Sequence, residues 1–206
     1  MMQKEAEPQN LEANAAKIKM NTQVAQLLHL DEDTLKAKSK ELADAIKRAS
    51  EGSPRILVTG GAGSGKTTIA RILSTLFVVK NLDLDEYIPG GWTSDSREYA
   101  RRFSKGLYEL WEDVPRKKGW VIEHVEACNS LLTGLYRPDF AVLVDPGEER
   151  LREASEARSA VMGANDSKDR LARALQSDKI AKTQFNSLPG EVILKIPGFL
   201  LKKIDN

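Results

Sequence analysis

The stretch 55–73 constrains the fold of this chain more than any other part of it. It opens with an apolar run at 56–58 and closes with a helical pattern at 69–73. Between them lies the pattern G-x-x-x-x-G-K-[ST], whose defined positions are Gly60, Gly65, Lys66 and Thr67. The sequence therefore predicts a strand, a glycine-rich loop and a helix in immediate succession.

A loop of this composition can wrap a phosphate group. Its backbone N–H groups must point inward, which requires unusual dihedral angles and close approach, and glycine permits both. The helix that follows adds free N–H groups and the positive end of its dipole. We predict that Lys66 is catalytic and reaches the β- and γ-phosphates, while the Thr67 hydroxyl ligates Mg²⁺. The predicted nucleotide-binding residues are Gly60, Gly61, Ala62, Gly63, Ser64, Gly65, Lys66, Thr67 and Thr68.

The rest of the chain alternates apolar runs with helical stretches. After the loop, runs suitable for strands occur at 77–85, 120–123, 140–145 and 192–196. Helical patterns lie at about 94–111 and across the charged region 148–182. This alternation predicts an α/β fold with a five-stranded parallel sheet and helices on both faces.

Residues 1–50 carry two helical patterns of their own. They are separated by the polar break 31–34, and 51–54 links the second pattern to the first strand. We expect a helical hairpin here, forming an N-terminal extension at 1–50 beside a domain at 51–206. The interpretation we favour is an extension packed on the domain. The alternative is a docking element for a partner or for a second copy of the chain.

Composition narrows the cellular setting. The formal net charge is +1, so no overall field favours nucleic acid or membrane. Cys128 is the single cysteine, which leaves no disulfide within the chain. The N-terminal residues lack the apolar segment of a signal peptide, and no apolar run has transmembrane length. We therefore expect a cytoplasmic protein without membrane contact.

The loop resembles that of the P-loop NTPase superfamily, and three further segments resemble its small kinases. These are the nucleoside, nucleotide and shikimate kinases, with uridine-kinase-like enzymes closest in pattern. The segments are 82–87, 121–125 and 142–151, although His124 stands where the family pattern has glycine. The resemblance implies ATP and Mg²⁺ as ligands, the strand order 2-3-1-4-5 and a lid at about 150–182.

Two carboxylates are candidates for the reaction centre. Asp85 ends the second predicted strand, at the edge where α/β sheets bind ligands. We predict that Asp85 is the general base that takes the proton of the acceptor, with Asp83 in reserve. By resemblance, Glu123 at the end of the third strand binds Mg²⁺ or positions the acceptor.

Arginines form a third group of candidates, because guanidinium groups stabilise the charge of a transferring phosphoryl group. We predict Arg97 and Arg101 as acceptor-binding residues and Arg152 and Arg158 as lid residues. The aromatic residues within 97–118 are compatible with base stacking, although inward packing is the interpretation we favour.

The predicted function is an ATP- and Mg²⁺-dependent kinase. Its acceptor is a small molecule or a nucleic acid, and the acceptors we favour are a nucleoside, a nucleotide or a polynucleotide. The guanine-reading segment N-K-x-D of GTPases does not occur in the sequence. The alternative is a regulatory or assembly ATPase that holds a partner through the N-terminal helices.

Overall fold

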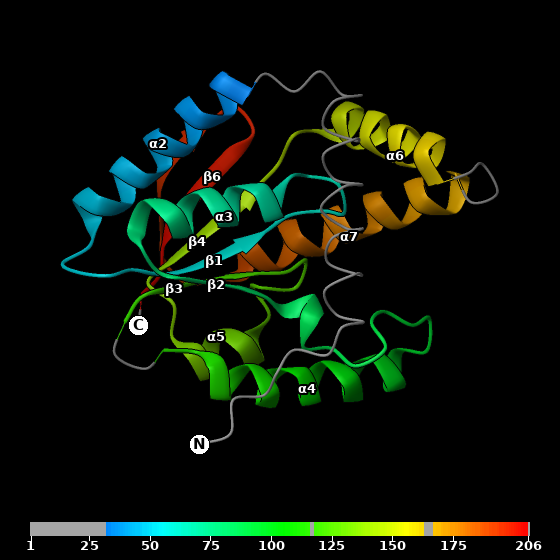
Figure 1. Cartoon of the computed structure of the whole chain (residues 1–206), viewed down its shortest axis with the longest axis horizontal. Helices are drawn as coiled ribbons and strands as arrows, with labels where there is room; N and C mark the ends of the chain where they lie inside the picture. Colours follow the sequence, from blue (N-terminus) through cyan, green and yellow to red (C-terminus); the bar gives the residue numbers. More distant parts are fainter. Residues whose placement is uncertain (1–31, 116–117, 163–166, 206) are drawn as a thin grey trace.

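A computed structural model describes residues 32–115, 118–162 and 167–205. In chain order the elements are α2 (Glu32–Ala49), β1 (Arg55–Thr59), α3 (Lys66–Phe77), β2 (Lys80–Asp83), the 3₁₀ turn η1 (Leu84–Glu86), α4 (Ser96–Asp113), β3 (Trp120–Glu123), α5 (Ser130–Tyr136), β4 (Phe140–Val144), α6 (Glu148–Met162), α7 (Ser167–Ser187), β5 (Glu191–Ile196) and β6 (Phe199–Lys203). Figure 1 shows them as a central sheet with helices on both faces, which confirms the predicted α/β class.

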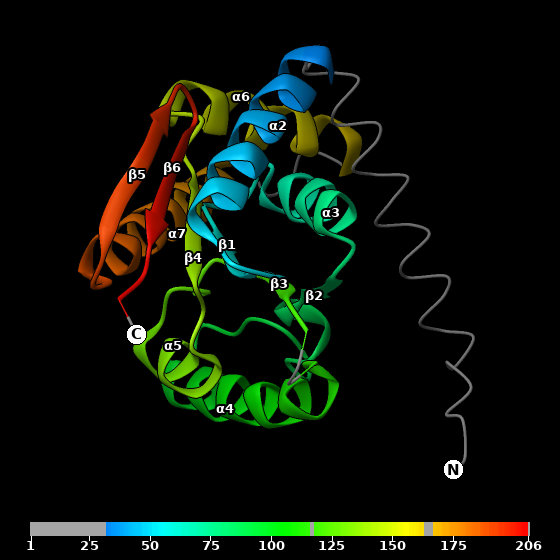
Figure 2. The same cartoon turned by 90° about the vertical axis from the view of Figure 1, so that its left-hand side faces the viewer.

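The sheet has the order β2-β3-β1-β4-β6-β5. The first four strands are parallel and stand in the predicted order. The predicted five-stranded sheet lacks β6, which lies between β4 and β5 and pairs antiparallel with both. β5 therefore runs in the direction of the four parallel strands, as predicted, but it is not the neighbour of β4; it forms an antiparallel hairpin with β6. Two residues, Pro197 and Gly198, connect these strands, and Gly198 has a φ of +88°. Such a short turn reverses the chain at once, so no crossover helix can form. Figure 2 shows the hairpin at one edge of the sheet.

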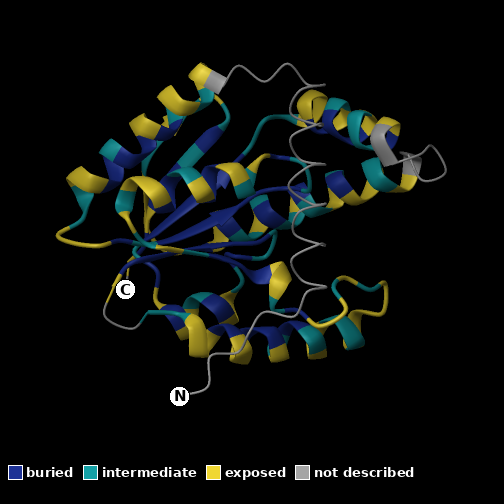
Figure 3. Cartoon of the chain, viewed as in Figure 1, coloured by how far each residue is buried: buried dark blue, intermediate teal, exposed yellow. Residues whose placement is uncertain are grey.

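Each face of the sheet builds its own hydrophobic core. Side chains alternate along β1, so Ile56 and Val58 pack with α2 and α3, while Leu57 packs with α4, α5 and α7. Strands β3 and β4 are buried along their whole length, as expected of central strands covered on both sides. Figure 3 shows the strands as the buried layer between the helices. The carboxyl ends of the parallel strands are thus held in place by packed side chains on both faces of the sheet.

Helix α2 belongs to one of these cores. Leu42, Ala43, Ala45 and Ile46 are buried against the face that α3 covers. The Lys38 ammonium also donates to the carbonyl oxygen of Pro197, 2.9 Å away, in the β5–β6 turn. This packing agrees with the favoured interpretation of the second N-terminal helix. The first predicted helix lies outside the described residues, and the domain boundary at residue 50 stays a prediction.

No helix within 32–115, 118–162 and 167–205 is both long enough and apolar enough to span a bilayer.

Candidate functional site

The glycine-rich loop joins β1 to α3 with the backbone that its sequence predicts. Gly63 and Gly65 have φ angles of +87° and +93°, in the left-handed region that favours glycine. A β-carbon at Gly60 would lie 2.6 Å from the carbonyl oxygen of Val144, so a larger residue cannot pass the end of β4. Gly65 caps α3, which begins at Lys66. The loop therefore directs a helix N-terminus toward the carboxyl end of the parallel strands.

Glu123 is the buried acid of this edge. It ends β3, in register with Val58 of β1 and with Asp83 of β2. Only 1 % of its surface is exposed. Among the described residues, neither of its carboxylate oxygens has a hydrogen-bond partner. Such a group is costly to bury unless something else binds it.

The electrostatic surroundings of Glu123 are mixed. Burial raises the pKa of this carboxyl above its ordinary value, which favours the protonated form. The Lys66 ammonium lowers the pKa and the Asp83 carboxylate raises it, in that order of size. The Thr67 hydroxyl also acts to lower it, although it does not reach full hydrogen-bond geometry. Lys66, Thr67 and Glu123 are therefore close together, and their roles in binding phosphate and Mg²⁺ stay predictions.

This group fits Mg²⁺ bound together with phosphate. Mg²⁺ is usually held by one or two carboxylates and by the phosphates of a substrate, with water completing the shell. Within the ranges that the structure describes, no cluster of three or more His, Cys, Asp and Glu is placed to hold a metal alone. The oxygens of Glu123 and the Thr67 hydroxyl are the groups of this chain that could bind such an ion.

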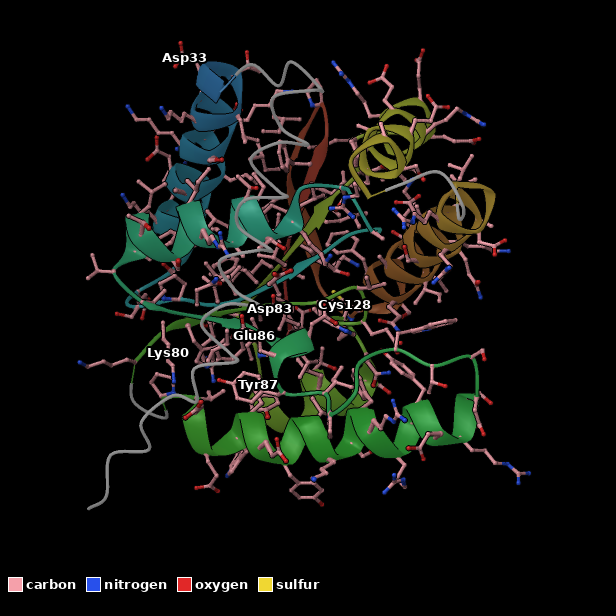
Figure 4. All side chains as sticks on the ribbon, turned by 45° about the vertical axis from the view of Figure 1, so that its right-hand side comes forward. Asp33, Lys80, Asp83, Glu86, Tyr87 and Cys128 are labelled. Carbon is pink, nitrogen blue, oxygen red and sulfur yellow. The ribbon has the colours of Figure 1, made fainter. Side chains whose placement is uncertain are left out.

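Asp83 and Asp85 lie in different surroundings: Asp83 is buried in the turn, and Asp85 is exposed. Asp83 is 8 % exposed, and its Oδ1 accepts the Asp85 N–H at 3.0 Å, which caps η1. Figure 4 shows Asp83 at this turn, between the sheet and α4. The Asp85 side chain is 57 % exposed and reaches the neighbouring cavity. The turn thus explains why Asp83 stays buried while Asp85 points outward.

His124 holds the Asp85 carboxylate, and the sequence reasoning missed this role. Its Nε2 lies 3.2 Å from Asp85 Oδ1, and its side chain is 4 % exposed. Its Nδ1 accepts the Glu126 N–H at 3.0 Å, so Nδ1 carries no proton and Nε2–H is the donor to Asp85. The backbone N–H of His124 donates to Val58, which continues the sheet beyond β3. The sequence did contain one indication of this role, because His124 stands where the pattern of the small P-loop kinases has glycine.

Helix α7 crosses the glycine-rich loop. Its Ser177 hydroxyl accepts the N–H of Ala62 at 2.8 Å. A β-carbon at Gly61 would lie 2.8 Å from Cβ of Asp178. Lys182 pairs with Asp178 and with Asp145, at 2.8 Å each, and so ties α7 to the end of β4. This helix is therefore placed to cover a phosphate in the loop, and Ser177 was not predicted from the sequence.

Of the two predicted lid arginines, one lies at the loop. The Nη1 of Arg158 would lie 3.8 Å from a β-carbon at Gly63. Its Nε has no hydrogen-bond partner among the described residues, and burial lowers the pKa of its guanidinium. Arg152 instead pairs with Glu148 on the exposed side of α6, at 3.1 Å. Of these two arginines, Arg158 is the one that borders the loop, and its role toward phosphate stays a prediction.

A cavity of about 270 Å³ opens beside Asp85 and the loop. Its walls come from η1, α4, α7 and the loops that follow β2 and β3. The polar and aromatic lining residues are Asp85, Trp92, Tyr99, His124, Glu126, Arg173, Gln176 and Ser177. The Trp92 ring lies 5.8 Å from the Arg173 guanidinium, measured to the ring centroid.

The predicted acceptor-binding arginines do not line this cavity. Arg97 is exposed near the start of α4, where its backbone N–H donates to Asp95. The Arg101 side chain is 74 % exposed and pairs with Glu98 at 2.9 Å. Their role in binding an acceptor stays a prediction, since neither residue lies in the wall of the cavity.

Comparisons with known proteins add only a likeness of fold. No family model and no curated protein matches the chain. A shikimate kinase from Acinetobacter baumannii, solved in complex with shikimate, has 20% sequence identity and a TM-score of 0.45, covering 66% of this chain and 83% of that one. A shikimate kinase from Bacteroides thetaiotaomicron has 18% identity and a TM-score of 0.45, covering 65% and 82%. At such values, function has to be inferred from the residues of this chain, and the narrower resemblance to uridine kinases stays a prediction.

Proposed function

We propose that this protein is an ATP- and Mg²⁺-dependent phosphotransferase of the P-loop kinase kind. It transfers the γ-phosphoryl group to a hydroxyl-bearing acceptor of low molecular mass. The observation that carries the proposal is the pairing of a phosphate-binding loop with an acid-lined cavity at the same sheet edge. Glu123, Lys66 and Thr67 lie on the loop side, and Asp85 lies on the cavity side.

Each residue at the sheet edge has a separate role in the proposed phosphoryl transfer. Lys66 and the helix N-terminus attract the phosphate chain. Thr67 and Glu123 hold Mg²⁺, which when bound neutralises charge on the phosphates. Asp85 orients the acceptor hydroxyl and takes its proton, while the His124 N–H keeps the carboxylate in place.

Helices α6 and α7 act as the lid in this proposal. Arg158 brings a guanidinium to the loop, and Ser177 brings a hydroxyl to the N–H of Ala62. Covering the loop excludes water, which would otherwise compete with the acceptor for the phosphoryl group.

The test is the variant Asp85→Asn with three measurements: acceptor-dependent rate, ATP affinity and melting temperature. If Asp85 is the general base, the variant should transfer phosphate about 10²–10⁴ times more slowly than the unsubstituted protein, with its ATP affinity unchanged. Weaker Mg²⁺·ATP binding together with the lost rate would make Asp85 a metal ligand instead. A loss of stability alone, about 0.5–2 kcal/mol, would leave it a turn residue. Asp205→Asn, an exposed change near the C-terminus, is the control for charge removal.

Dependence on an acceptor separates the kinase from its alternative. A kinase consumes ATP only slowly until an acceptor hydroxyl is supplied. ATP turnover that no added nucleoside, nucleotide or sugar accelerates would support a regulatory or assembly ATPase.

A further inference from the structure

The cavity beside Asp85 restricts the size of the acceptor. Its volume is about 270 Å³, just below the range of roughly 300–1,000 Å³ that is usual for small-molecule sites. Ala62, Val125 and Ile180 contribute apolar wall between the polar groups. A cavity of this size holds one or two rings, and a polymer cannot place several residues within it.

The charges in the cavity wall disfavour an anionic acceptor. Asp85 and Glu126 are its carboxylates, and Arg173 is the one cationic side chain among the described residues that line it. His124 adds no charge, because its Nδ1 accepts the Glu126 N–H. A phosphate or a second carboxylate would therefore meet a wall with an excess of negative charge.

Arg173 is also committed to contacts within the protein. Its guanidinium lies 5.8 Å from the centroid of Trp92, in the range of a cation–π interaction. Its Nε donates to the Asp169 carbonyl oxygen at 3.3 Å, within α7. The nearby α4 does not add a phosphate clamp, because Arg101 and Arg102 both pair with Glu98.

The remaining groups suit hydroxyls and a flat ring face. Trp92 is 61 % exposed at the cavity, which leaves ring surface for stacking. Burial and the charge of the neighbouring Glu126 raise the pKa of the Tyr99 hydroxyl, so the Glu126 carboxylate lies beside Tyr99, where it can accept O–H donors of a bound molecule. Gln176 and Ser177 add an amide and a hydroxyl to the wall.

We infer that the acceptor is an uncharged hydroxyl compound with one flat or apolar face, such as a nucleoside or a sugar, and that Trp92 provides its stacking surface. This inference rests on the proposed kinase function. It excludes nucleotides, polynucleotides and carboxylate-bearing acceptors as preferred substrates.

The test compares matched acceptors that differ only in charge. Transfer from γ-labelled ATP is measured for the four ribonucleosides and for their 3′- and 5′-monophosphates, so that each pair keeps a free hydroxyl. Glucose, its 1- and 6-phosphates and shikimate extend the comparison to sugars and to a carboxylate. In each pair, kcat/KM for the uncharged acceptor should be at least about tenfold higher than kcat/KM for its anionic counterpart.

Two variants examine the residues involved. Trp92→Ala should raise KM for the uncharged acceptor by about tenfold and leave KM for ATP unchanged, as the loss of one stacking surface predicts. Trp111→Phe is the matched control, because Trp111 lies on α4 outside the cavity wall. Glu126→Gln removes one negative charge and should narrow the preference for uncharged acceptors.

The possible failures are distinguishable. Faster transfer to the phosphorylated or carboxylated members would overturn the inference and leave the kinase function standing. An unchanged acceptor KM in Trp92→Ala would remove the stacking role. Absence of transfer to every member of both groups would overturn the proposed function itself.

Discussion

Replacing Glu123 by glutamine should stabilise the free protein while weakening its response to Mg²⁺·ATP. Glu123 is 1 % exposed, and neither oxygen has a hydrogen-bond partner among the described residues. A buried polar group without a partner costs about 1–3 kcal/mol, and a charged one more. The Lys66 ammonium offsets part of that cost. We therefore expect Glu123→Gln to gain about 1–2 kcal/mol at pH 8, or about 2–8 °C in melting temperature for a chain of this length.

The effect has a defined dependence on pH. Burial raises the pKa of Glu123 above its value in the unfolded chain, which is about 4.3. The contribution of this carboxyl to stability is therefore fully present below about pH 4.3 and is lost as the pH rises through the folded pKa. The difference between Glu123→Gln and the unsubstituted protein should thus be small in acid and grow toward pH 8.

Thermal unfolding from pH 4 to pH 9, with and without Mg²⁺·ATP, measures both parts of the prediction. Ligand should raise the melting temperature of the unsubstituted protein strongly and that of Glu123→Gln much less. Glu191→Gln, at an exposed position of β5, controls for the loss of a carboxylate. A Glu123→Gln protein that is less stable at every pH would refute the reasoning, because it would show that the carboxylate is satisfied within the fold.

Three further predictions concern the loop, the His124 contact and the lid. Lys66→Ala should abolish phosphoryl transfer and leave the protein folded, with a lower melting temperature at neutral pH than in acid, because Glu123 loses the ammonium that offsets part of the cost of burying its charge; the transfer rate and the melting temperature together check this. His124→Ala should lower the acceptor-dependent kcat by about tenfold and shift its pH profile without changing KM for ATP, because Asp85 loses its N–H donor; partial recovery in His124→Gln would distinguish a lost donor from lost packing. Hydrogen exchange in 148–187 should slow when a non-hydrolysable ATP analogue binds, and unchanged exchange would count against a lid.

The parts of the structure that could be predicted from the sequence depend on local patterns. The glycine spacing at 60–65 requires particular backbone angles, so the loop follows from the residue types alone. The four parallel strands are short apolar runs separated by helices, which predicts the α/β class, while their order was implied by the resemblance to small P-loop kinases. Asp85 and Glu123 could be placed together because both follow strands that end at the same sheet edge.

The parts that were missed depend on contacts between distant residues. β6 was not predicted: the turn Pro197–Gly198 reverses the chain after β5, and the position of β6 between β5 and β4 depends on pairing with β4, which lies far away in the sequence. Ser177 lies in a charged helical stretch where nothing local marks it, yet the packing of α7 brings it to Ala62. The charge run on α6 likewise does not distinguish Arg158 at the loop from Arg152 in a surface pair.

The most direct test of the central claim is the fate of the γ-phosphoryl group, followed by ³¹P NMR with ATP, Mg²⁺ and an added uncharged acceptor. The residues at the loop and the cavity predict a new phosphomonoester signal that grows as ATP is consumed, and that Lys66→Ala abolishes. Inorganic phosphate appearing as the sole product, at a rate that no acceptor changes, would contradict a kinase.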